Sequence, residues 1–166
     1  MTPHEISYHI RGAAMEVYNT LGPGLLESVY HKALVLELES KGLKVESEVP
    51  VKVYYKGELM EEDALRLDIV VEDQVVLELK SVEMLMPIHF KQLRTYLRLY
   101  NKELGWLINF GAYDFSEGLC SVKLGKEDRI YLLLAALLLE KSYKSYLREY
   151  LASKIIKFSE IDYHRF

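Results

Sequence analysis

The sequence predicts an α/β domain in which helices flank a mixed sheet, and three observations indicate this class. Half of the 166 residues are apolar, which is enough for one domain with a core of its own. Apolar residues recur at helical spacing up to residue 40 and come close to alternation from residue 45 onward. Two helices, a run of strands, one helix and further strand follow in order, which is typical of a layered α/β domain.

Two helices are expected at the start of the chain. The first begins at a capping box formed by Thr2 and Glu5, with Pro3 at the first helical position. Gly22 would end it. The second helix runs from about residue 26 to 40. Its expected apolar positions include Val29, Ala33, Leu36 and Leu38.

The middle of the chain is expected to form strands. They span residues 45–55, 65–71 and 75–80, with turns at 56–58 and 72–74. A third helix is expected from about residue 88 to 101. Two more strands are expected at residues 105–110 and 119–124.

The stretch VVLELK, residues 75–80, ends in two charged side chains. Side chains alternate across a strand, so Glu78 and Lys80 point to the same face, together with Val76. The same alternation in the preceding strand predicts two opposite faces: Arg66, Asp68 and Val70 on one, and Leu67, Ile69 and Val71 on the other. An odd loop, such as 72–74, would place Asp68 across from Glu78 at about 5 Å. An even loop would place Asp68 opposite Leu79 instead.

Two carboxylates that face each other on a half-buried sheet repel unless something compensates. A divalent cation would do so, and hard oxygen ligands suit Mg²⁺ or Mn²⁺. A lysine beside the metal can orient a water for attack on a phosphate. The alternative is a surface strand end in which Lys80 pairs with Asp68 or Glu78.

Two further segments carry polar candidates, each with an ordinary explanation. In GLLESVY, Glu27 stands at the start of a helix, where the helix dipole favours a carboxylate and where it could also bind a metal. In KQLRTYLRLY, Gln92 and Tyr96 are four residues apart and share one helix face. The alternative for this segment is an amphipathic helix whose inward positions are Leu93, Leu97 and Tyr100.

These segments resemble a known pattern. Asp68 followed by Glu78-Leu79-Lys80 is similar to the motif of the PD-(D/E)XK, or restriction-endonuclease-like, phosphodiesterase superfamily. Gln92 to Tyr96 is similar to the QxxxY motif of its RecB-like branch. The resemblance extends over roughly residues 6–111, and it implies a restriction-endonuclease-like mixed β-sheet flanked by helices.

A narrower resemblance lies near the start of the chain. Gly24, Glu27 and Tyr30 spell GxxExxY, the signature of a family of small proteins within that superfamily. The stretches LGPGLLESVY, RLDIVVED, VVLELKSV and LGWLINFG are similar to that family as well.

The resemblance implies a metal site. Asp68 and Glu78 would coordinate Mg²⁺ or Mn²⁺, with the backbone carbonyl of Leu79 as a third protein ligand. Glu27 would be a further acidic ligand or would orient a metal-bound water.

The resemblance also implies roles for three other residues. Lys80 would position the attacking water and stabilise charge on the phosphate. Gln92 and Tyr96 would line the site and hold the substrate or the catalytic lysine. The expected function is a metal-dependent nuclease whose substrate is DNA rather than RNA. The alternative is a nuclease-like fold with little catalysis that serves as a nucleic-acid or protein binding module.

Composition limits the partners and the location. The formal net charge is −4, so no overall basic field attracts nucleic acid or an anionic membrane. A short, single-stranded or structured substrate, or a partner that supplies the basic surface, fits this charge better than a long duplex. No apolar run reaches about 18 residues, and Cys120 is the single cysteine. We therefore expect a cytoplasmic protein with no membrane span and no disulfide.

The resemblance fades after residue 110, and the chain is expected to divide near residue 125. Residues 1–125 would form the nuclease-like domain, and 126–166 a C-terminal helical extension. The run IYLLLAALLLE within the extension is apolar all round but too short to span a bilayer. We expect the extension to pack on the core or to form a homodimer contact.

Overall fold

The computed structural model describes the backbone of residues 1–125 and the side chains of these residues other than 62–64. The order of elements within that range is the predicted one. The elements are α1 (Pro3–Leu21), α2 (Glu27–Ser40), β1 (Val45–Tyr55), β2 (Glu58–Val71), β3 (Val75–Lys80), α3 (Pro87–Leu99), β4 (Leu104–Asn109) and β5 (Leu119–Lys123). The C-terminal helical extension and the dimer contact expected for 126–166 lie outside the described residues.

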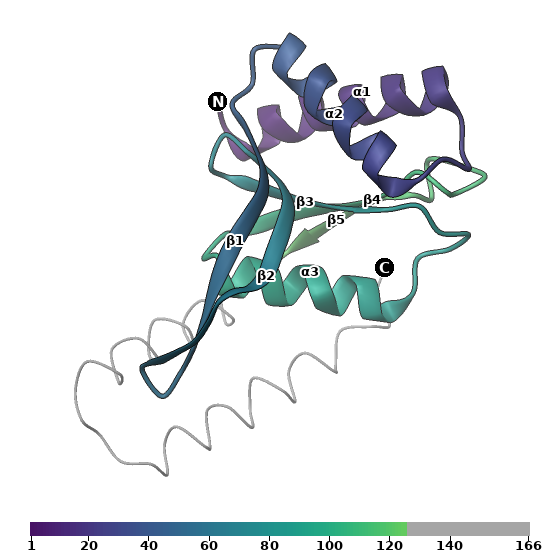
Figure 1. Cartoon of the computed structure of the whole chain (residues 1–166). Helices are drawn as coiled ribbons and strands as arrows, with labels where there is room; N and C mark the ends of the chain where they lie inside the picture. Colours follow the sequence, from purple (N-terminus) through teal and green to yellow (C-terminus); the bar gives the residue numbers. More distant parts are fainter. Residues whose placement is uncertain (126–166) are drawn as a thin grey trace.

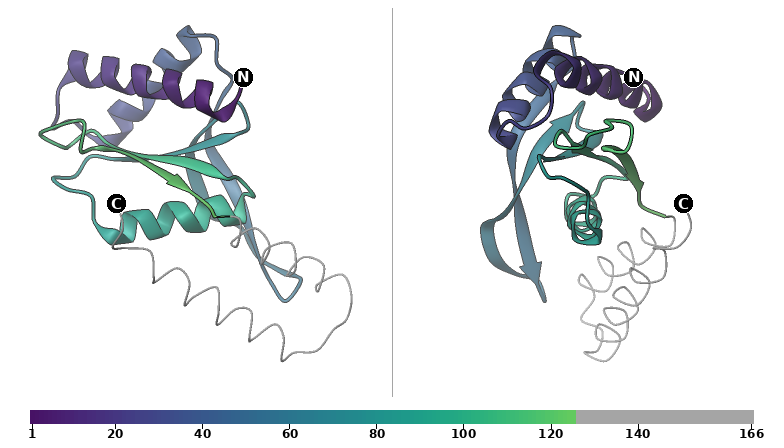
Figure 2. Two further views of the ribbon diagram at one scale, coloured as in Figure 1. Left: turned by 180° about the vertical axis from the view of Figure 1, so that it is seen from behind. Right: turned by 90° about the vertical axis from the view of Figure 1, so that its right-hand side faces the viewer.

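The described strands form one mixed sheet in the order β1-β2-β3-β4-β5. The pair β3 and β4 is parallel, and the other three neighbouring pairs are antiparallel. Helices α1 and α2 cover one face of the sheet, and α3 covers the other (Figure 1). The views from behind and from the side show the same three layers (Figure 2). The predicted α/β fold, a mixed sheet flanked by helices, is therefore confirmed.

Each face of the sheet has its own apolar cluster. The first cluster joins α1 and α2 to the sheet and includes Ile6, Tyr30, Leu34, Ile69, Leu77, Leu79 and Phe110. The second joins α3 to the sheet and includes Leu67, Val70, Val76, Leu93, Leu97 and Leu107. Because both faces are covered, every residue of β3 except Lys80 is buried. A charged side chain on this strand therefore leaves water when the chain folds.

The first helix begins as predicted, whereas the second is rotated from the expected orientation. The Thr2 hydroxyl accepts from the Glu5 amide, and the Thr2 amide donates to the Glu5 carboxylate. In α2 the buried residues are Tyr30, Leu34 and Leu38. The expected apolar positions Val29 and Leu36 are 40% and 68% exposed. The rotation follows from Tyr30, whose ring stacks on Phe110 and must face the sheet.

The hairpin of β1 and β2 is longer than predicted. Strand β2 begins at Glu58 rather than at residue 65, directly after the two-residue turn Lys56-Gly57. Both turn residues have positive φ, at 52° and 86°, as the favoured two-residue hairpin turns require. The far end of this hairpin extends past the α3 layer (Figures 1 and 2).

The turn between β2 and β3 has three residues, Glu72 to Gln74. The residues on either side of it, Val71 and Val75, pair across the two strands. This is the odd loop considered from the sequence. The last pair of this register is Ile69 with Leu77, and one residue further along each strand stand Asp68 and Glu78. The length of the turn thus brings the two carboxylates to the same place along the strands.

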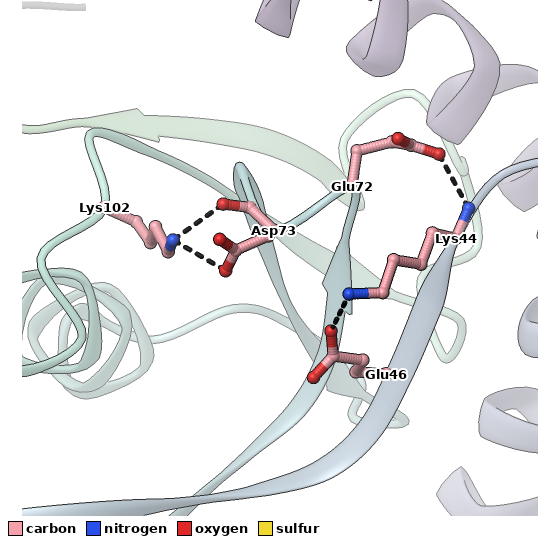
Figure 3. Close-up of polar contacts among 5 residues, drawn as sticks. All are labelled: Lys44, Glu46, Glu72, Asp73 and Lys102. Atoms are coloured by element: carbon pink, nitrogen blue, oxygen red, sulfur yellow. Dashed lines mark hydrogen bonds and ion pairs between the residues drawn. The ribbon is translucent and has the colours of Figure 1, made fainter.

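Glu72 and Asp73 in this turn both have positive φ, which is costly for residues other than glycine. Contacts from two other segments offset this cost and hold the turn. A Glu72 carboxylate oxygen accepts from the Lys44 amide at 2.7 Å. The Lys102 ammonium donates to the carbonyl and the carboxylate of Asp73 at 2.6 and 2.7 Å. Figure 3 shows these contacts, which tie the turn to the segments leading into β1 and β4.

Candidate active site

Strand β3 presents its side chains as the sequence predicts. Leu77 and Leu79 belong to the cluster under α1 and α2, while Val76 belongs to the cluster under α3. Glu78 is 2% exposed and pairs in register with Leu107 of the α3-side cluster. Burial of a carboxylate among apolar side chains is costly unless it has partners.

Strand β2 changes face at Asp68. Leu67 packs in the same α3-side cluster as Val70, whereas Ile69 packs under α1 and α2. The prediction that Leu67 and Ile69 share a face is therefore wrong. The reason is a local break in the ladder, because no pair joins Glu48 to Asp68 and Glu48 has a φ of 53°. On the other side of β2, pairing with β3 ends at Ile69.

Asp68 bonds to two other elements at this break. Its carboxylate Oδ2 accepts from the Leu79 backbone N–H at 2.7 Å. Its backbone carbonyl lies 3.0 Å from Nε2 of His31, on α2. The carboxylate is thus fixed toward β3, beside the strand that carries Glu78 and Lys80.

The Glu78 carboxylate has one bonded and one unbonded oxygen. Oε1 accepts from the Lys80 ammonium at 2.5 Å. Oε2 is buried and has no hydrogen-bond partner among the described residues. Burial, together with the charge of Asp68, raises the pKa of Glu78 to about 7, against the opposing effect of Lys80. An unpaired buried acceptor costs about 1–3 kcal/mol, so this oxygen would gain from a cation or a donor.

The neighbouring groups are coupled to Glu78. Burial raises the pKa of Asp68, although the Leu79 N–H and the charge of Lys80 oppose it. Burial lowers the pKa of Lys80, but the bond and charges from the carboxylates outweigh this, so the net shift is upward. Lys80 is therefore cationic at neutral pH, 14% exposed, and held against Glu78.

The GLLESVY segment forms the loop that leads into α2 and the start of that helix. Gly24 has a φ of 101°, a conformation that other residues rarely adopt. The Tyr30 hydroxyl donates to the Gly22 carbonyl at 2.6 Å and accepts from the Leu25 amide at 3.0 Å. These bonds close the loop that leads into α2 and so place Glu27 at the helix start, where it is exposed.

Glu27 and Asp68 both line a cavity of about 410 Å³. The lining residues are Glu27, Ser28, His31, Lys32, Glu48, Asp68 and Leu79. The charge of Glu27 also raises the pKa of Asp68 and Glu78. It is thus close enough to act on both carboxylates through its charge.

A divalent cation fits part of this arrangement. Within residues 1–125, no three Asp, Glu, His or Cys side chains come together as an ion-holding group. The structure thus brings Asp68 and Glu78 together but leaves Glu27 outside such a group. A cation at this place would bind the Glu78 Oε2, which has no hydrogen-bond partner among the described residues. It would also lower the raised pKa values of Asp68 and Glu78.

Comparison with known families agrees with this geometry. Residues 4–122 match the family described as the PD-(D/E)XK nuclease superfamily. The chain belongs to this superfamily. No curated protein and no solved structure gives a significant match to the sequence.

The superfamily match includes α3, which carries Gln92 and Tyr96. Gln92 Nε2 donates to the Tyr96 hydroxyl at 2.7 Å, so the two share a helix face as predicted. Burial raises the pKa of Tyr96, and the charges of Glu78 and Asp68 add to the shift. The pair therefore lies within electrostatic reach of the site. Leu93 and Leu97 are buried on the same helix, so the amphipathic description also holds.

The loop after β3 is fixed by residues that sequence reasoning did not single out. Asn109, at the end of β4, is 1% exposed. Its Oδ1 accepts from the Val82 amide, and its Nδ2 donates to the Val82 carbonyl. The Phe110 amide donates to the Lys80 carbonyl at 2.8 Å. The backbone on both sides of Ser81 is thus held to the neighbouring strand, which limits where Lys80 can point.

His31 and Glu48 were also missed. Both line the cavity with Asp68, and His31 Nε2 lies 3.8 Å from a Glu48 carboxylate oxygen. A sequence signal for His31 existed, because it follows Glu27 by four residues and so shares its helix face. Glu48 offered no such signal, since its place depends on the irregular backbone at the β1–β2 break.

Among residues 1–125 no helix has the length and apolar composition needed to cross a bilayer. Cys120 is a free, partly buried thiol on β5, and burial raises its pKa.

Proposed function

We propose that this protein is a metal-dependent nuclease of the PD-(D/E)XK superfamily. The observation that carries the proposal is the buried Glu78, which pairs with Lys80, feels the charge of Asp68 and has one oxygen without a hydrogen-bond partner among the described residues. Such an arrangement is costly for folding, and perturbed carboxylates beside a lysine are typical of catalytic sites.

Asp68, Glu78 and the Leu79 carbonyl would hold Mg²⁺ or Mn²⁺, with Glu27 as a further ligand or as an acceptor for a bound water. Oxygen ligands of this kind suit these hard cations. When bound, the metal would lower the pKa of a coordinated water and neutralise charge on the scissile phosphate.

Lys80 would orient the attacking water and stabilise the negative charge that develops on a phosphate oxygen. Its ammonium is already held at the site by Glu78. Gln92 and Tyr96 would line the substrate side, where their mutual hydrogen bond fixes both side chains. The reaction adds water across one P–O bond and leaves a phosphate monoester and a hydroxyl group.

We further propose that the chain belongs to the GxxExxY branch and acts on DNA. The support for the branch is the structural use of the motif, because Gly24 permits the loop, Tyr30 closes it and Glu27 lines a cavity together with Asp68. The net charge of −4 favours a short, single-stranded or structured substrate over a long duplex.

Thermal unfolding with and without Mn²⁺ tests the metal site. A ligand that binds only the folded state stabilises it by RT ln(1 + [L]/Kd), about 2.7 kcal/mol at one hundred times Kd. We expect Mn²⁺ to raise the Tm of the wild type and to have little effect on Asp68→Asn, which keeps an acceptor for the Leu79 amide. The exposed Asp114→Asn is the control and should respond like the wild type. An equal Mn²⁺ shift in Asp68→Asn would contradict the assignment.

A further inference from the structure

The second turn of α2 places a histidine against the backbone of Asp68. His31 Nε2 lies 3.0 Å from the Asp68 carbonyl oxygen, and its side chain is 17% exposed. A carbonyl oxygen only accepts hydrogen bonds, so Nε2 carries the proton in this contact. We propose that His31 is a positioning residue that holds Asp68 in the orientation from which its carboxylate serves the site. This inference rests on the proposed function for the role of Asp68.

The hydrogen-bonded ladder of the sheet is broken at Asp68. Neither Glu48 on one side nor Glu78 on the other pairs with it in the sheet register. Its carbonyl therefore needs a partner from elsewhere, since an unpaired backbone acceptor in a partly buried place is costly. His31 supplies that partner from a different layer of the fold.

This break allows β2 to change the face to which its side chains point. Leu67 and Val70 pack on the α3 side, and Asp68 lies between them where alternation fails. The Asp68 carboxylate can then reach the Leu79 amide at 2.7 Å. Without His31, the Asp68 peptide could turn back toward regular alternation, and this bond to β3 would weaken.

The position of His31 in α2 places it beside the same cavity as Asp68. It follows Glu27 by one helical turn, and both residues line the cavity with Asp68. Glu48, whose carboxylate lies 3.8 Å from Nε2, approaches the ring from β1. One helix thus carries an acidic residue that lines the cavity and the residue that would orient the carboxylate of Asp68.

Two variants separate the hydrogen bond from the bulk of the ring. His31→Gln retains an N–H donor at a reach similar to Nε2, and His31→Leu retains apolar volume without a donor. His31→Asn, whose amide stops short of the Asp68 carbonyl, replaces His31→Leu if that variant does not fold.

The first readout needs no metal. Amide hydrogen exchange by NMR compares Leu79, whose N–H binds Asp68, with Leu77, which pairs with strands on both sides. We expect His31→Leu to speed exchange at Leu79 about tenfold or more relative to Leu77, because local opening there becomes easier. His31→Gln should keep the wild-type ratio. A purely structural role would change both amides together and leave their ratio unaltered.

The second readout is Mn²⁺ affinity by calorimetry. Removing a residue that orients a metal ligand weakens binding by about 10- to 100-fold, and we expect this for His31→Leu but not for His31→Gln. An unchanged exchange ratio in His31→Leu, or the same loss in both variants, would overturn the proposal. If the wild type bound no Mn²⁺, the proposed metal site would fall, and the exchange ratio would still decide the role of His31.

Discussion

At Glu78 a carboxylate is almost fully buried, with one oxygen on Lys80 and the other unbonded within the described residues. Its pKa rises from 4.5 to about 7 because burial and the charge of Asp68 disfavour ionisation. A carboxyl group with a raised pKa binds its proton more tightly in the folded state than in the unfolded state. Its contribution to stability is therefore present below pH 4.5 and is lost as the pH rises to about 7.

The metal-free protein should consequently lose stability between these two pH values. The difference between a pKa of 4.5 and one of about 7 corresponds to roughly 3–4 kcal/mol at most, since one pKa unit is about 1.4 kcal/mol. Urea unfolding in EDTA at pH 5 and pH 7.5 measures the difference. Glu78→Gln cannot ionise, so its stability should depend less on pH. The same pH dependence in Glu78→Gln and the wild type would show that another group is responsible.

Tyr30 and Tyr18 form a matched pair of residues with different expected effects on the site. Each ring stacks on a phenylalanine of the same cluster, and each hydroxyl donates to loop carbonyls. Tyr30→Phe and Tyr18→Phe should both lower the free energy of unfolding, by about 1–2 kcal/mol. Only Tyr30 closes the loop that leads to Glu27.

The Tm increase caused by Mn²⁺ therefore distinguishes the two variants. We expect a smaller increase in Tyr30→Phe and a wild-type increase in Tyr18→Phe. Equal Tm increases in both variants would show that the loop before α2 does not affect metal binding, and would contradict a role for Glu27 as a ligand.

At the scale of elements, the connection from β3 to α3 is held against the end of β4. Asn109 bonds to both backbone groups of Val82, and Gly111 packs against the same residue. A Cβ on Gly111 would lie 2.5 Å from the Val82 carbonyl oxygen and 2.6 Å from its amide nitrogen. Since both are backbone atoms, the loop itself would have to move.

Gly111→Ala should therefore lower the free energy of unfolding by about 1–3 kcal/mol, as overpacking does. It should also reduce cleavage beyond what the lost stability explains, because Val82 is two residues from Lys80. Gly12→Ala is the control, since a Cβ in the middle of α1 would meet nothing within 4 Å. That change should raise stability by about 0.5–1 kcal/mol. A Gly111→Ala protein as stable and active as the wild type would rule out this role for the loop.

The elements also show what the sequence could predict and where local rules stopped. The capping box and the faces of β3 follow from short-range rules, and both appear in the structure. Alternation left the loop between β2 and β3 odd or even, and the structure has the odd, three-residue loop. The orientation of α2 depends on Tyr30 stacking on Phe110, eighty residues away in the chain. The change of face at Asp68 depends on a break shared by two strands, which alternation within one strand does not reveal.

At the scale of the whole molecule, the proposed site draws its residues from different layers. Asp68, Glu78 and Lys80 come from the sheet, Glu27 and His31 from α2, and Gln92 and Tyr96 from α3. The motifs identified these residues except His31, because motif residues keep their chain order and spacing. Residues that hold the backbone near them, such as Asn109 on Val82, were missed because their partners lie on other segments of the chain.

The proposed reaction is cleavage of a phosphodiester bond by Asp68, Glu78 and Lys80 with the help of a divalent metal. Cleavage of labelled single-stranded, duplex and branched DNA, and of RNA, in Mg²⁺ and Mn²⁺ tests it most directly. We predict cutting of DNA by the wild type that EDTA, Glu78→Gln and Lys80→Ala each abolish, with Asp114→Asn as the active control. Cutting that survives both site substitutions, or no cutting of any substrate, would contradict the account and favour a binding module.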